Sequence, residues 1–282
     1  MSNADRFRSA RQAENFPVAL RVLPARVRAH LEALYGYARY VDDLGDEPDA
    51  VAGGRSERLA ALDAVARAVD DLYAGRPVAE PVVRALGPCV AACDLPADPL
   101  LRLVEANRVD QVVTRYATFD QLVRYCILSA NPVGELVLHV FGRASEERVA
   151  LSDRICTALQ IIEHLQDVAE DHRRGRVYLP GEDMKRFGVS EGDLSGDAAT
   201  PALRDLIALT AQRAAAWLES GAPLVSSLDG WARLAVGGYV AGGRAALTSL
   251  ARAGHDPLAN RVVVPRRLVL RHWMAAALRA AG

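Results

Sequence analysis

The sequence contains no run of roughly 18 or more residues without a charged side chain, so it predicts no transmembrane helix. Its first residues also have no apolar core. Asp5, Arg6, Arg8 and Arg11 occur there instead, which is unlike a secretory signal peptide. The formal net charge is only -1, which gives no general attraction to nucleic acid, and no nucleic-acid-binding motif is present. These absences predict a cytoplasmic protein with no nucleic-acid partner.

Cysteine is scarce, and the four residues are Cys89, Cys93, Cys126 and Cys156. Only one C-x-x-x-C spacing occurs, with no second pair to complete a zinc site, so we expect reduced and buried cysteines. Strand signals are scarce as well, because Ala, Leu and Arg dominate and few runs alternate between apolar and polar residues. With 51% apolar residues among 282, the chain is predicted to be all-α, with one substantial core or two small ones.

Helical periodicity and boundary residues together predict where the helices lie. Thr118 and Ser145 have the form of helix caps, Thr200 precedes a proline at the first helical position, and Pro132 is expected to break a helix. Residues 182–199 are expected to form a short helix and a loop. The predicted longer segments are 24–46, 56–74, 78–94, 99–113, 118–129, 145–171, 200–220, 228–252 and a basic segment at 261–282.

Two of these helices each carry a D-x-x-x-D pattern near their C-terminal ends. Asp42 and Asp46 lie in the first, and Asp167 and Asp171 in the second, so each pair is expected one turn apart on a helix face. Two such faces turned toward each other would repel strongly without cations. Magnesium fits, because it takes one or two carboxylates and completes its shell with water and phosphate oxygens. The patterns therefore predict a diphosphate substrate. The alternative is that these acidic pairs are ordinary solvated surface of the two helices.

Further polar residues accompany the second acidic pair. Gln160 and Glu163 precede it on the same predicted face, and Glu163 either binds magnesium or pairs with an arginine. Arg173, Arg174 and Arg176 follow it, and the planar guanidinium group binds two phosphate oxygens at once. The same arginines could instead complement the dipole of the preceding helix.

Longer blocks of sequence carry a family resemblance. They are ENFPV at 14–18, YGYARYVDDLGDE at 35–47, YCILSANPVGELVLHVFG at 125–142, LQDVAED at 165–171 and GRVYLP at 175–180. The chain resembles the squalene/phytoene synthase family of head-to-head prenyl synthases along nearly its whole length. Within that family it is most similar to the bacterial hydroxysqualene synthase branch of hopanoid biosynthesis. The resemblance implies a single-domain prenyl synthase helical fold over residues 1–282 with a central cavity. Residues 1–14 are polar and are expected to be loosely held.

The resemblance also implies roles for individual residues. The expected catalytic residues are Tyr35, Arg39, Asp42, Asp46, Asp167 and Asp171. The expected magnesium ligands are Asp42, Asp46, Glu163, Asp167 and Asp171. The expected substrate-binding residues are Phe16, Asp43, Tyr125, Ala130, Gly134, Gln160, Arg173, Arg174, Arg176, Tyr178 and His255. This sequence departs from the family pattern at Glu163, where most relatives carry Asn, and at His255, where Tyr is usual.

The implied reaction converts presqualene diphosphate and water to hydroxysqualene and diphosphate. Two alternatives stay open. One is condensation of two farnesyl or geranylgeranyl diphosphates to presqualene diphosphate, dehydrosqualene or phytoene, and the other is a non-catalytic lipid-binding relative. Residues 261–282 hold five Arg, one His and no acid, so they form either a closing helix of the bundle or a peripheral contact with the inner face of the membrane. A monomer and a homodimer are both compatible with the sequence.

Overall fold

The computed structural model describes residues 23–46, 54–259 and 262–279, without the side chains of Asp46 and of residues 274–279. The predictions for residues 1–14 and for Phe16 lie outside this range. The described residues form α-helices, one 3-10 helix at Glu191–Ser195 and no β-strand, so the all-α prediction is confirmed. The helices are α3 (Ala25–Asp46), α4 (Arg55–Tyr73), α5 (Pro81–Cys93), α6 (Ala97–Asp110), α7 (Phe119–Ser129), α8 (Asn131–Val140), α9 (Glu146–Gln166), α10 (Val168–Arg173), α11 (Gly181–Phe187), α12 (Pro201–Gly221), α13 (Pro223–Ser227), α14 (Gly230–Arg252) and α15 (Arg266–Arg279).

The predicted helix caps are confirmed by their hydrogen bonds. The hydroxyl of Thr118 accepts from the amide of Gln121 at 3.2 Å, and Ser145 and Thr200 cap α9 and α12 in the same way. The break at Pro132 is also confirmed, since α7 ends at Ser129 and α8 begins at Asn131. Local chemistry therefore accounts for these four helix boundaries.

The prediction of one helix over residues 145–171 is wrong. α9 ends at Gln166, and the backbone of Asp167 departs from helical geometry with φ of -105° and ψ of 16° before α10 begins. Two backbone hydrogen bonds flank the bend: the amide of Asp167 donates to the carbonyl of Glu163 at 3.0 Å, and the amide of Asp171 donates to the carbonyl of Asp167 at 2.8 Å. The segment contains neither proline nor glycine, the residues that usually mark a kink, so nothing in its sequence predicts the bend.

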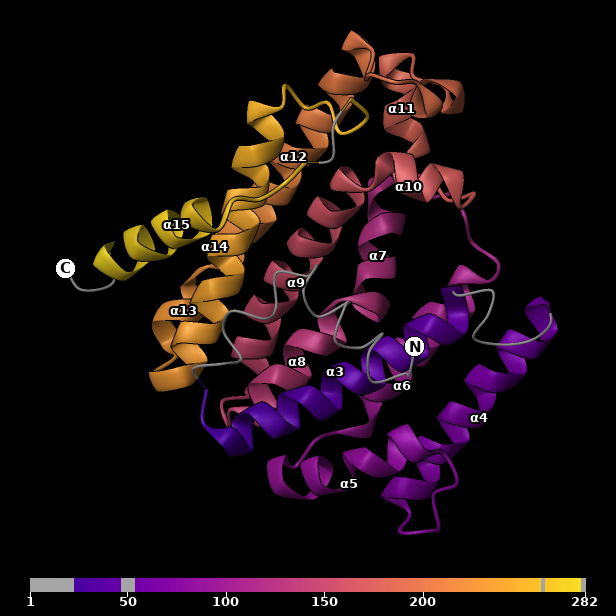
Figure 1. The fold of residues 1–282 in the computed structure, drawn as a ribbon, viewed down its shortest axis with the longest axis vertical. Helices are drawn as coiled ribbons and strands as arrows, with labels where there is room; N and C mark the ends of the chain where they lie inside the picture. The colour runs from indigo at the N-terminus through magenta and orange to yellow at the C-terminus, as the bar shows by residue number, and fades with distance from the viewer. Residues whose placement is uncertain (1–22, 47–53, 260–261, 280–282) are drawn as a thin grey trace.

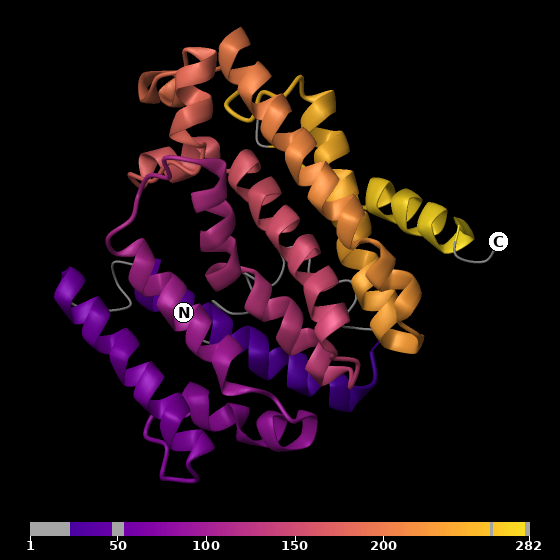
Figure 2. The same ribbon diagram turned by 180° about the vertical axis from the view of Figure 1, so that it is seen from behind.

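The apolar core consists of three clusters. One joins α3 to α4, α5 and α6, and within it the hydroxyl of Tyr37 donates to the carbonyl of Leu100 at 2.9 Å. A second joins α7, α9 and α12, and a third joins α9, α13 and α14. In Figure 1, α3 to α6 form the lower part of the molecule and α9, α12 and α14 the upper part, and Figure 2 shows the same arrangement from behind. α9 therefore contributes to two clusters and is held in place along its length.

α15 packs on α14, where the hydroxyl of Thr248 lies 3.3 Å from Nε2 of His272. Arg266, Arg267 and Arg271 are exposed on α15. This packing favours a closing helix with solvated arginines over a helix that lies wholly in a membrane surface. In the part of the chain that the structure describes, no helix is both long and apolar enough to cross a bilayer.

A buried carboxylate holds the turn after α14. Asp256 is only 5% exposed, and its Oδ1 accepts from the amides of Ala199, Leu258 and Ala259 at 2.9 to 3.2 Å. Its Oδ2 accepts from Arg204 at 2.6 Å. Burial alone would raise the pKa of Asp256, but the backbone donors and Arg204 outweigh it and hold the pKa below its ordinary value.

We expect Asp256→Asn to lower the free energy of unfolding by about 2 kcal/mol at pH 7, because charge-assisted hydrogen bonds are lost. The folded pKa lies below the unfolded one, so the carboxylate stabilises the fold above pH of about 4 and loses that effect as the pH falls through the folded pKa. Urea unfolding followed by circular dichroism should thus show a difference in the free energy of unfolding between the wild type and Asp256→Asn at pH 7, and this difference should be smaller at pH 3. Asp197→Asn, at an exposed position nearby, is the control, and an equal difference at both pH values would contradict the assignment.

Candidate active site

The first acidic segment lies at the C-terminal end of α3. Nε of Arg39 lies 2.8 Å from Oδ1 of Asp43, and a longer contact of 3.8 Å joins Arg39 to Asp42. The side chain of Asp42 is 54% exposed, against 31% for Asp43. Arg39 and Asp43 thus form a positioned pair, while Asp42 extends toward the solvent side of the helix. Tyr35 precedes them by one turn on the same face and is half-buried.

A close approach of two helices positions this end of α3. Gly45 is buried against α6, and a Cβ at this position would overlap the side-chain oxygen of Asn107. Nε2 of Gln111 donates to the carbonyl of Gly45 at 3.0 Å, and Oε1 of Gln111 accepts from Arg58 on α4 at 2.9 Å. The acidic end is therefore bound to the end of α6 and does not extend freely.

The second acidic segment follows the bend between α9 and α10. Oδ2 of Asp171 lies 3.6 Å from Nδ1 of His164. This oxygen is buried and accepts no hydrogen bond from the described residues. On the other side of the imidazole, Nε2 of His164 lies 3.3 Å from the amide nitrogen of Gln160. His164 thus connects Gln160 to Asp171 across the bend.

An aromatic cluster packs around His164. The imidazole stacks on Tyr178 with a centroid distance of 3.6 Å and an interplanar angle of 12°, and Tyr116 and Tyr125 pack against Tyr178 at 5.6 and 5.8 Å. The hydroxyl of Tyr125 donates to Asp110 at 2.6 Å. Burial, together with Tyr178 and Asp110, raises the pKa of Tyr125 well above its ordinary value, so the phenol keeps its proton.

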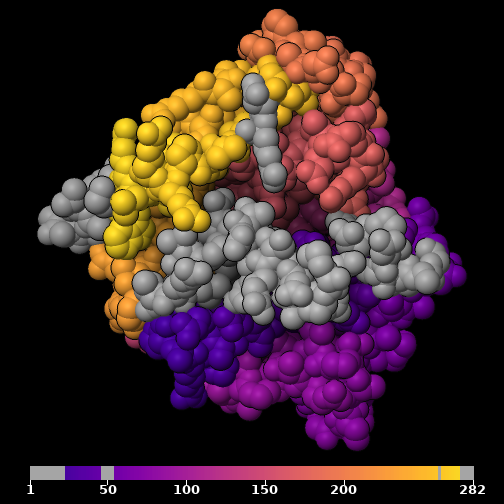
Figure 3. All heavy atoms as spheres, viewed as in Figure 1, coloured from indigo at the N-terminus to yellow at the C-terminus, as the bar shows by residue number. Residues whose placement is uncertain are grey.

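The cluster connects the two acidic segments through a continuous series of contacts. The end of α3 binds Gln111, Asp110 one residue earlier binds Tyr125, and Tyr125 packs on Tyr178. Tyr178 then stacks on His164, the neighbour of Asp171. Figures 1 and 2 place α10 and the C-terminal end of α3 on the same side of the molecule. In Figure 3 that face is hollowed between α10 and the C-terminal segment, with α9 set back between them.

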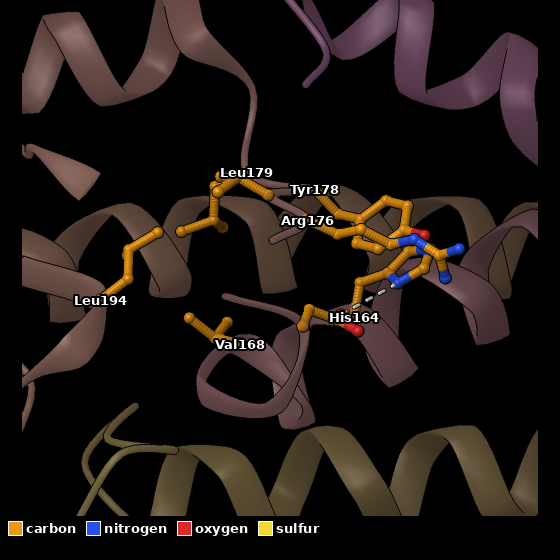
Figure 4. A pocket seen from close by; sticks show the side chains of 8 residues that line it. His164, Val168, Arg176, Tyr178, Leu179 and Leu194 are labelled. Carbon is orange, nitrogen blue, oxygen red and sulfur yellow. Dashed lines mark ion pairs between the residues drawn. The ribbon is translucent and has the colours of Figure 1, made fainter. Parts of the chain in front are cut away.

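The three predicted phosphate-binding arginines differ in their surroundings. Arg173 is exposed, and Arg174 pairs with Glu170 at 2.9 Å on the surface. Arg176 instead lines a small pocket beside the stacked rings of His164 and Tyr178 (Figure 4). The other lining residues are Val168, Asp171, Val177, Leu179 and Leu194.

Contacts with the segment after α6 hold the turn that precedes Arg176. Nη1 of Arg115 donates to the carbonyl of Gly175 at 2.6 Å, and the amide of Val177 donates to the carbonyl of Thr114 at 2.9 Å. Arg115 itself makes two bonds to Glu191, at 2.6 and 2.8 Å. Arg176 is therefore directed toward the pocket by a braced backbone.

Helix packing accounts for two of the residues that follow the break between α7 and α8. Asn131 is 3% exposed, and a 3.0 Å hydrogen bond joins its amide group to the hydroxyl of Thr157 on α9. A Cβ on Gly134 would overlap Ser152 and Cys156, so close packing on α9 by itself requires glycine here. Roles for Ala130 and Gly134 at a substrate stay predictions.

The remaining predicted residues are more scattered. Glu163 is exposed on α9, and Asp167 is half-buried at the bend. His255 lies in the turn that ends α14, where its φ is 55° and its amide donates to the carbonyl of Leu250 at 2.9 Å. The side chain of Asp46 lies outside the described residues. Binding roles for these residues stay predictions.

Sequence reasoning missed the importance of His164 and Tyr116. A usable signal existed for His164, because it lies four residues after Gln160 and seven before Asp171, on one helical face. The predicted metal ligands on that face were all carboxylates. Tyr116 has no such signal, since its contacts with Tyr125 and Tyr178 join segments distant in sequence.

The described carboxylates fit a hard divalent cation. Oxygen donors suit magnesium, and the buried oxygen of Asp171 has an unused acceptor position that a cation could fill. Among the described side chains, however, these carboxylates do not form a compact set of three or more ligand atoms. Such an arrangement suits ions held jointly by the protein and by a ligand with oxygens of its own.

Comparisons with known proteins agree with this arrangement. The family model described as squalene/phytoene synthase matches residues 9–271. The hydroxysqualene synthase of Zymomonas mobilis is 34% identical over 254 residues, covering 89% of this chain and 82% of that protein. The phytoene synthase of Mycobacterium tuberculosis is 32% identical over 220 residues, covering 77% and 70%. The crystal structure of the squalene synthase HpnC from Alicyclobacillus acidocaldarius superposes with a TM-score of 0.80 at 40% identity, covering 88% of this chain and 92% of that one.

Proposed function

Because this chain belongs to the squalene/phytoene synthase family, we propose that it converts presqualene diphosphate and water to hydroxysqualene and diphosphate with the help of Mg²⁺. The observation that carries the proposal is the small pocket that Arg176 and Asp171 both line, together with the buried Oδ2 of Asp171, which has no hydrogen-bond donor among the described residues. A guanidinium group and a carboxylate that line one pocket suit a magnesium diphosphate, in which anionic oxygens and cations alternate. The hydroxysqualene synthase named among the relatives supports the choice of reaction.

In this proposal Asp42, Asp46, Asp167 and Asp171 hold the ions, with Glu163 as a further ligand. Bound Mg²⁺ supplies positive charge that stabilises the departing diphosphate. Arg176 binds diphosphate oxygens through its planar fork. Arg39 does the same from α3, where its pair with Asp43 fixes its direction. The stack of His164 on Tyr178 orients Asp171 and excludes water from its buried side.

The reaction begins when the bond between carbon and the diphosphate oxygen breaks and both electrons leave with the oxygen. A carbocation remains, and water adds to it and loses a proton, giving an alcohol. Aromatic faces stabilise a nearby cation, and Phe16, Tyr35 and Tyr125 are the proposed wall. Tyr125 is buried in the aromatic cluster and bound to Asp110, so Tyr35, one turn before Arg39, is the stronger candidate among the described residues.

The second candidate function is condensation of two prenyl diphosphates to presqualene diphosphate, dehydrosqualene or phytoene. The similarity to a phytoene synthase, nearly equal to that with the hydroxysqualene synthase, favours keeping it. Both reactions begin with the same loss of diphosphate, so the same polar residues would serve either one. The two reactions differ in the number of prenyl diphosphates that are bound, in the length of the apolar chains and in the fate of the cation.

A product assay separates the two reactions. Purified protein with Mg²⁺ is given presqualene, farnesyl or geranylgeranyl diphosphate separately, without nicotinamide, and products are identified by mass spectrometry. We expect hydroxysqualene from presqualene diphosphate alone. A C40 product, or turnover of farnesyl diphosphate while presqualene diphosphate stays intact, would refute the proposed reaction.

Removing a proposed metal ligand tests the ion-binding part of the proposal. We expect Asp42→Asn and Asp171→Asn each to lower kcat/KM about 100-fold or more, because the charge that holds the cations is lost. A chelator should abolish wild-type activity and Mg²⁺ should restore it. Asp70→Asn, exposed on α4, is the control, and circular dichroism checks that helical content is intact. Unchanged turnover in folded Asp171→Asn would rule out this role.

The different surroundings of the arginines allow a matched pair of variants. Arg176→Gln should lower kcat/KM roughly 100-fold, the usual effect of losing one donor to a developing anion. Arg174→Gln should change it by less than about twofold, since Arg174 pairs with Glu170 on the surface. Inhibition by inorganic pyrophosphate should weaken only in the first variant. An equal decrease of kcat/KM in both variants would show that Arg176 has no larger role in diphosphate binding than Arg174.

A further inference from the structure

A second cluster of ligating side chains lies away from the acidic segments, between α3 and α5. His30 contributes a ring nitrogen from α3, and Cys89 and Cys93 contribute thiols one helical turn apart on α5. The three ligand atoms all lie within 4.8 Å of one another, and among the described residues no other set of three or more such side chains is this compact. Cys89 is 1% exposed, and the other two residues are half-buried.

The polar atoms of this cluster lack strong partners. Nε2 of His30 is buried and has no hydrogen-bond partner among the described residues. Sγ of Cys89 makes only a long contact of 3.9 Å with the carbonyl of His30 and a contact with the thiol of Cys93. Buried polar atoms are almost always satisfied, and an unsatisfied one requires an explanation. A bound cation would supply a partner for the imidazole of His30 and ligate both thiols as well.

We propose that His30, Cys89 and Cys93 bind one Zn²⁺ ion. Imidazole nitrogen and thiolate sulfur are the ligands that zinc prefers, whereas magnesium and calcium prefer oxygen. Tetrahedral zinc places such ligand atoms about 3.5 to 3.8 Å apart, so small side-chain rotations from the observed spacing suffice. Two thiolates and a neutral imidazole leave a fourth position for water.

The other explanation for adjacent cysteines is a disulfide. A bond between Cys89 and Cys93 would close one turn of α5 and leave Nε2 of His30 unsatisfied as before. Zinc instead uses all three side chains and joins α3 to α5. The ion would lie apart from the proposed prenyl site, because His30 lies twelve residues before Asp42, about 18 Å along the same helix.

Metal binding to purified protein tests the proposal without any substrate. Protein stripped with chelator and dialysed against excess Zn²⁺ should retain one equivalent per chain, and its melting temperature should rise by roughly 5 °C. Co²⁺ as a spectroscopic substitute should give an intense thiolate-to-cobalt charge-transfer band. Cys93→Ser and His30→Gln should lose both the retained ion and the band.

The two remaining cysteines provide matched controls. Cys126→Ser and Cys156→Ser each remove a thiol outside the cluster and should bind zinc like the wild type. As a readout that needs no variant, Zn²⁺ should slow alkylation of Cys93 in the native protein. The proposal would be overturned if the wild type retained no zinc, or if Cys93→Ser and His30→Gln bound as much zinc as the wild type. Neither result bears on the prenyl reaction, whose assay depends on Mg²⁺ and on other residues.

Discussion

The stack of Tyr178 on His164 is the contact on which the rest of the candidate active site depends. It joins the segment after α10 to α9, and Tyr125 ties the same tyrosine to Asp110 at the end of α6. Gln111, the next residue, binds the end of α3. Two carboxylate-bearing ends would repel each other in a low dielectric. The rings of Tyr125 and Tyr178 lie between the elements that hold these two ends. They help to keep the ends on one side of the molecule without adding charge.

The helices could be predicted because their boundaries depend on local chemistry. Thr118, Ser145 and Thr200 each satisfy an amide within the first turn, so a short stretch of sequence contains the whole interaction. Pro132 interrupts its helix for an equally local reason. The family could be recognised in the same way, since the blocks around Asp42 and Asp167 are contiguous in sequence.

The features that sequence reasoning missed are those decided by distant contacts. No residue near Asp167 predicts the bend. The segment that follows it, with Tyr178 and the turn before Arg176, is held by contacts with residues 114–116, which are distant in sequence. The choice between Arg174 and Arg176 likewise depends on how that turn is held. The cluster of His30, Cys89 and Cys93 escaped notice because the spacing of the cysteines gives no hint of a histidine one helix away.

The two backbone hydrogen bonds at Asp167 flank the bend, one at the end of α9 and the other at the start of α10. The contact of Asp171 with His164, and the stack of His164 on Tyr178, help to set the angle at which Asp171 is presented. A substitution at Tyr178 or His164 would redirect that carboxylate without dismantling a helix. Relatives in this family are named for different products. A bend of this kind offers an evolutionary route by which the carboxylate of Asp171 can change its position relative to the apolar part of a substrate while the helices stay intact.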